Sequence, residues 1–68
     1  MKYKVEVFMK NADVISMDIN SNAGIEDTLR KFNKMFRKNK GKLYLSDSKQ
    51  GQMIPAENIN YLNLISLD

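Results

Sequence analysis

Apolar residues recur with the spacing of a helix over more than one turn in only one segment of this chain. This limits the fold to strands built around a single helix. In residues 2–9 the apolar side chains recur at every second position, which is typical of a half-buried strand. Over residues 25–36 they recur at every third or fourth position, which indicates a helix with one apolar side. The residues on that side are Ile25, Leu29, Phe32 and Phe36.

The segments on either side of this helix have the features of strands. Residues 15–19 alternate like the first segment, and the polar turn at 10–13 joins the two runs into a predicted hairpin. After the helix, residues 42–46 form a predicted strand with Leu43 and Leu45 pointing inward. The inward side chains of the opening hairpin are Tyr3, Val5, Val7, Met9, Ile15, Met17 and Ile19.

The last third of the chain predicts a short strand at 52–54, which Pro55 ends, and then one tight helical turn at 56–59. Residues 61–67 are apolar at both odd and even positions, so we expect a strand with a neighbour on each side. The expected fold is an α+β domain in which the amphipathic helix packs on one face of a small mixed sheet. That sheet has four to five strands in the order ββαββ.

Three features together span the whole chain. They are the opening hairpin of residues 1–19, the helix start with Ser21, Ile25, Glu26, Asp27 and Leu29, and the turn at 54–59 ahead of an apolar last strand. This pattern resembles the ubiquitin-like β-grasp fold. The resemblance implies that the last strand lies at the centre of the sheet, parallel to the first. The chain ends in Ser66-Leu67-Asp68 rather than the terminal Gly-Gly of the conjugated members, so attachment to other proteins is not expected.

Charged and polar residues fit both ends of the predicted helix. Side-chain oxygens of residues 20–22 are available to cap its N-terminus. Glu26 precedes Arg30 by one turn, and Asp27 precedes Lys31 by the same spacing, which predicts two ion pairs on the exposed side.

The chain contains neither histidine nor cysteine among its 68 residues. Histidine exchanges protons most readily near neutral pH, and both residues are common ligands of zinc, so we expect no enzymatic activity, no cofactor and no metal site. A chain of this length forms one domain, residues 1–68, with a small core, and pairing of two copies would bury more apolar surface. No apolar run approaches the roughly 18 residues that a membrane crossing needs, so we expect a cytoplasmic protein without membrane contact.

A basic segment between residues 30 and 42 is one candidate site. Lysine and arginine side chains neutralise phosphates, so this segment is a candidate for binding nucleic acid. The alternative, which we favour, is a solvated helix face opposite the apolar stripe. The net charge of +3 permits an anionic partner without requiring one. The candidate residues are Lys34, Arg37, Lys38, Lys40 and Lys42.

The sheet face turned away from the helix is the second candidate site, because aromatic residues alternate there with lysines. Such a face can pack against a protein partner or a second copy of the chain. It can also stack on nucleic-acid bases, or its aromatic residues can simply pack across strands. We expect a small binding or regulatory module that acts by protein contact here, with nucleic-acid binding by the basic segment as the alternative. The protein-contact candidates are Phe8, Tyr44, Tyr61 and Lys4, with Tyr61 dependent on which side of its strand it occupies.

Overall fold

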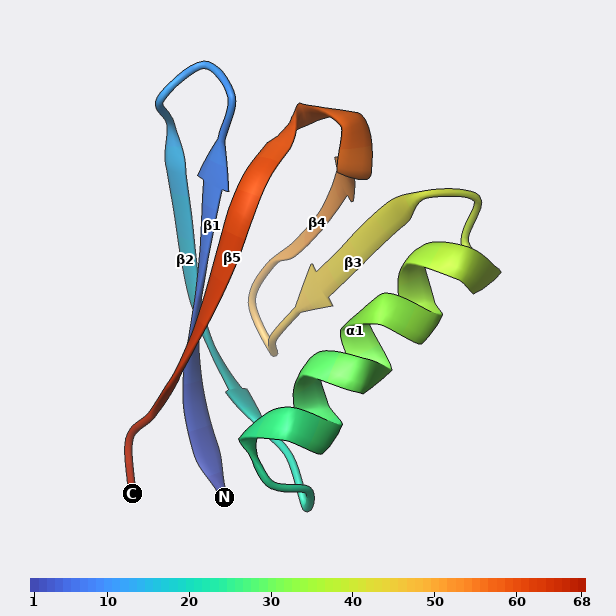
Figure 1. Cartoon of the computed structure of the whole chain (residues 1–68). Coiled ribbons are helices and arrows are strands. Elements are labelled where there is room, and N and C mark those ends of the chain that lie inside the picture. The colour runs from blue at the N-terminus through green and yellow to red at the C-terminus, as the bar shows by residue number, and fades with distance from the viewer.

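Five strands, one α-helix and a short 3₁₀ turn make up the fold in the computed structural model, which describes residues 1–68 (Figure 1). Each element lies where the sequence predicts it, and β2, β4 and β5 begin earlier than expected. The elements are β1 (Lys2–Met9), β2 (Val14–Asn20), α1 (Ile25–Lys38), β3 (Lys42–Ser46), β4 (Gly51–Pro55), η1 (Ala56–Asn58) and β5 (Ile59–Ser66).

The strands form two antiparallel sheets. The predicted α+β class is therefore correct, but the prediction of a single mixed sheet is wrong. The larger sheet has the order β2-β1-β5, and β3 and β4 form a separate hairpin. Val5 of β1 lies opposite Met17 of β2 and Leu64 of β5, and both pairings are antiparallel. The last strand is therefore an edge strand, antiparallel to the first, whereas the ubiquitin-like resemblance implies a central and parallel one.

β5 is apolar on both of its faces although it has only one neighbouring strand. Leu62 and Leu64 are half-buried and pack against the core. Tyr61 and Ile65 point to the opposite face of the sheet, where they are exposed. The outward apolar residues of β5 thus belong to a surface, and the sequence pattern alone does not distinguish this from burial.

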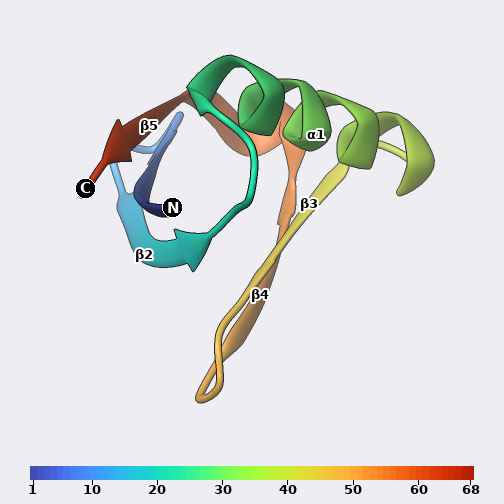
Figure 2. The same ribbon diagram turned by 90° about the horizontal axis from the view of Figure 1, so that it is seen from below.

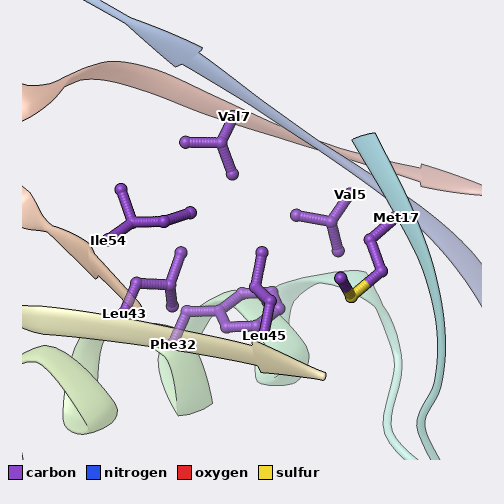
Figure 3. Close-up of a cluster of buried hydrophobic side chains, with 7 residues drawn as sticks. All are labelled: Val5, Val7, Met17, Phe32, Leu43, Leu45 and Ile54. Atoms are coloured by element: carbon purple, nitrogen blue, oxygen red, sulfur yellow. The ribbon is translucent and has the colours of Figure 1, made fainter. Parts of the chain in front are cut away.

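A single core joins the two sheets and the helix (Figure 3). The three-stranded sheet and the hairpin turn their inner faces toward each other, and Phe32 of α1 fills the space between them. Leu43 and Leu45 point inward as predicted, as do the inward residues of the opening hairpin. The fully assembled cluster consists of Val5, Val7, Met17, Phe32, Leu43, Leu45 and Ile54.

The side of the helix that lies on this core is rotated from the predicted one and overlaps with it only in part. Phe32 is buried and Phe36 half-buried, but Ile25 and Leu29 are exposed, so half of the predicted apolar stripe is wrong. The buried side is instead centred on Thr28 and Phe32. Polar bonding explains this rotation, because the Thr28 hydroxyl donates to the Ala23 carbonyl at 3.3 Å. Its oxygen also lies 2.9 Å from the Ser21 hydroxyl.

Both helix ends are closed mainly by the backbone. The N-cap is Gly24, without a side-chain hydrogen bond, so the predicted capping by residues 20–22 is wrong. At the other end, Lys40 and Gly41 take positive φ angles of 56° and 79°. The Gly41 N–H donates to the Phe36 carbonyl, which is the bond that closes a Schellman turn.

The whole molecule resembles a barrel with one side left open (Figure 2). The three-stranded sheet curves around one side of the core, the β3–β4 hairpin stands opposite, and α1 covers the side where β5 and β3 come together. β2 and β3, which belong to different sheets, do not pair with each other. The opening between them faces away from the helix in this view.

Candidate functional site

The outer face of the three-stranded sheet carries a cluster of apolar side chains at one end, here called the aromatic patch: half-buried Phe8 with exposed Val14 and Tyr61. The rings of Phe8 and Tyr61 stack at a centroid separation of 4.5 Å and an interplanar angle of 14°. Val14 lies opposite Phe8 on β2. Val14 and Tyr61 are each 50% exposed, although both are large apolar side chains.

The other end of this face carries Lys4. It is half-buried between Asp18 of β2 and Ile65 of β5, which lie opposite it in the two ladders. Three of the predicted protein-contact residues, Phe8, Tyr61 and Lys4, therefore share one face, because Tyr61 lies on the outward side of β5. No helix or strand covers this face, because α1 and the hairpin both lie on the other side of the sheet (Figure 2).

Tyr44 does not belong to this face. It lies on β3, opposite Met53, on the side of the hairpin that points away from the core. Because the hairpin and the three-stranded sheet face each other, their outer surfaces point in different directions. The expected single face containing both Phe8 and Tyr44 is thus wrong, since it assumed one continuous sheet.

The basic residues lie on the exposed side of α1 and just beyond its C-terminal end. Four of the five nucleic-acid candidates are exposed, and Lys42 is half-buried. None of them makes an ion pair. Arg30 binds both Glu26, at 2.8 Å, and Asp27, at 3.3 Å, so the first predicted helix ion pair is present and the one between Asp27 and Lys31 is absent.

A groove of about 510 Å³, here called the β2–β3 groove, occupies the open side of the molecule. Residues 18–20 of β2 form one wall, and residues 44–48 of β3 and the following turn form the other. Phe32 and Met35 of α1 lie at its base. The groove is not predictable from the sequence, because it is made by three elements whose relative placement no local pattern encodes.

The acidic side chains do not gather into one cluster. No three of them come together as a metal site would require. Asp47 is held in a turn, where its carboxylate accepts hydrogen bonds from the Lys49 and Gln50 N–H groups at 2.8 and 2.9 Å. These bonds hold the pKa of Asp47 below its ordinary value, because they stabilise the ionised form of the carboxyl group. The one α-helix has neither the length nor the apolar character that a membrane crossing requires.

No family model, curated protein or solved structure matches this chain.

Proposed function

We propose that this protein is a non-catalytic binding module that acts by protein–protein contact through the outer face of its three-stranded sheet. The aromatic patch is the observation that supports this function. A stacked pair of rings beside an exposed valine leaves apolar area in water, and contact with a partner would remove it. Large rigid aromatic side chains are enriched in protein interfaces because they bury much area at little entropic cost.

The surroundings of the aromatic patch also fit a protein interface. Polar and charged side chains, among them Glu6 and Ser16, lie next to the patch along the strands. An apolar centre with a polar rim is the usual composition of such interfaces. A second copy of the chain is one partner of this kind, since two-fold pairing places the same patch on both sides of the contact.

A charge introduced into the aromatic patch tests the proposal. Tyr61→Asp places a carboxylate in the centre of the contact and should abolish self-association in sedimentation equilibrium, or retention of bound proteins in affinity capture. Met53→Asp is the matched control, because Met53 is 56% exposed but lies on the outer side of the hairpin. Equal behaviour of wild type and both variants in the two measurements would contradict the proposed face.

Nucleic-acid binding is the second candidate, and the basic segment favours it. Its five candidate side chains have no acidic partner, so their charges are available to phosphates. A labelled oligonucleotide should then bind at low salt, with an affinity that falls steadily as salt is added. Lys34→Glu together with Lys38→Glu should reduce this affinity strongly, whereas Lys49→Glu in the exposed hairpin turn should not. Absence of binding at low salt removes this candidate.

A further inference from the structure

Two strand edges without partners border the β2–β3 groove. β2 pairs only with β1, and hydrogen-bonded and non-hydrogen-bonded residue pairs alternate along an antiparallel ladder. The Met9 N–H donates to the Asp13 carbonyl at one end of this ladder. By that alternation, the N–H and C=O groups of Ser16, Asp18 and Asn20 point away from β1. None of these three N–H groups donates to another group of the protein.

The edge of β3 on the opposite wall has a backbone donor with a poor partner. The Asp47 N–H donates to the Gln50 carbonyl, so the same alternation turns the backbone groups of Tyr44 and Ser46 away from β4. The Tyr44 N–H donates to the sulfur of Met35 at 3.4 Å. A thioether is a weak acceptor, and a peptide carbonyl would be a stronger one. Both walls thus offer backbone groups that an added chain could satisfy.

The base and the charge of the groove further restrict what fits. Phe32 and Met35 supply an apolar base, and Leu45 adds an apolar side chain to the β3 wall. Asp18 and Asp47 are the charged residues of the lining, which contains no lysine or arginine although the chain carries a net charge of +3. Neither carboxylate makes an ion pair. The groove therefore suits an occupant that is apolar in part and positively charged.

We propose that the β2–β3 groove binds an extended peptide segment of a partner protein that carries lysine or arginine, and that this segment adds as a strand to the free edge of β2. In strand addition, main-chain hydrogen bonds supply affinity and alternate side chains supply specificity. Here the peptide backbone bonds to Asp18 and Asn20, and a cationic side chain approaches Asp47. The larger sheet of a second copy does not match this occupant, because neither of its edge strands, β2 and β5, contains lysine or arginine. The groove is separate from the aromatic patch, so this site is additional to the proposed function.

An NMR titration with two matched peptides tests this site. The first probe is a peptide of about eight residues in which valine and lysine alternate, long enough for an ordinary strand. The second has glutamate in place of lysine. At a salt concentration of about 0.15 M, the lysine peptide should bind and shift the amide signals of Ser16, Asp18, Asn20, Tyr44 and Ser46. The glutamate peptide should leave them unchanged.

Two kinds of variant separate backbone pairing from charge. Asn20→Pro removes an outward N–H inside the groove, at an edge position where proline is tolerated, and should weaken binding of the lysine peptide by about tenfold or more. Val14→Pro removes the equivalent group at the far end of the same edge and should have little effect. Asp18→Lys reverses one charge of the groove lining without removing the turn bonds of Asp47, and should also weaken binding by about tenfold or more. The Tyr61→Asp variant should bind the peptide like the wild type.

Three outcomes would overturn the proposal. The first is no binding of the lysine peptide up to about 1 mM, which is the weak end of measurable affinity. The second is equal binding of both peptides, or shifts confined to the aromatic patch or to the exposed side of α1. The third is a concentration-dependent shift at the same edge without any peptide, which would make a second copy the occupant.

Discussion

Tyr3 joins the core of the sheet to the start of the helix through one hydroxyl group. Its ring is buried, and its hydroxyl donates to the Ala23 carbonyl at 2.7 Å. Tyr3→Phe keeps the ring and removes this bond, so it should lower the free energy of unfolding by about 1 kcal/mol. Tyr61→Phe is the matched control, because Tyr61 is half exposed and makes no hydrogen bond, and its stability should be that of the wild type. Equal stabilities of the two variants in urea unfolding would contradict the role of this bond.

Lys40 has a backbone conformation that disfavours its own side chain. Its positive φ places it in the left-handed region, where a Cβ costs about 1–2 kcal/mol and glycine costs nothing sterically. Replacing Lys40 by glycine removes this steric cost, but part of the gain in stability is lost because glycine has more conformational freedom in the unfolded chain. Lys40→Gly should therefore raise the free energy of unfolding by about 0.5–1 kcal/mol. Lys40→Ala removes the same charge but keeps the Cβ, and should leave stability near that of the wild type; a gain shared by both variants would point to charge instead.

Asp47 should make the stability of the hairpin turn depend on pH. Its pKa is lowered in the folded protein by the two hydrogen bonds that its carboxylate accepts from backbone N–H groups. A lowered pKa means that the carboxylate stabilises the fold fully at pH values above its pKa in the unfolded chain. This contribution is lost as the pH falls through the lower, folded pKa. Asp47→Ala should thus be less stable than the wild type at neutral pH, and the difference should vanish in acid. Ser48→Ala, in the same turn, should show no such pH dependence.

At the scale of single elements, the side of α1 that faces the core decides which substitutions are costly. Phe32 is buried and Leu29 is 39% exposed, although the sequence assigned both to one stripe. Phe32→Ala should cost about 3–5 kcal/mol, because it empties space in the core. Leu29→Ala should cost about 1 kcal/mol or less, as expected of a surface substitution. Comparable losses for the two variants in chemical unfolding would restore the predicted stripe and contradict the observed rotation.

The spacing of apolar residues predicted the elements well but not how they face one another. A strand has only two sides, so alternation correctly identified Val5, Val7, Leu43 and Leu45 as inward residues. A helix can rotate about its own axis to any angle, so its apolar residues alone do not fix which side is buried. Here the hydrogen-bonded Thr28 is buried and the neighbouring Leu29 is exposed. The burial of Thr28 could not be predicted from apolar spacing, because threonine is polar and its hydroxyl is satisfied by Ser21, seven residues earlier.

At the scale of the whole molecule, strand order could not be derived from local pattern. An apolar edge strand with an exposed outer face and a central strand buried on both faces have the same composition. The aromatic patch was partly predictable, because Phe8 alternates outward in its strand, but its stacking on Tyr61 depends on how β1 and β5 pair. The β2–β3 groove was not predictable at all. It exists because the two sheets remain separate on that side of the core.

The shared core makes a further prediction about cooperativity. No hydrogen-bonded ladder joins the two sheets, so side-chain packing is the main link between them. A domain of this size is stable by roughly 3–10 kcal/mol. Leu43→Ala in the hairpin should cost about 2–5 kcal/mol, since Leu43 is fully buried.

If the two sheets unfold as one unit, hydrogen exchange should accelerate by the same factor in the Leu43→Ala variant at the hairpin amides and at Val5 and Met17 in the other sheet. Met53→Ala, on the exposed side of the same hairpin, should leave both sets nearly unchanged. Faster exchange confined to the hairpin would mean that β3 and β4 open alone. The β2–β3 groove would then have one fixed wall and one that separates from the core, and the bound peptide would have to hold that wall closed.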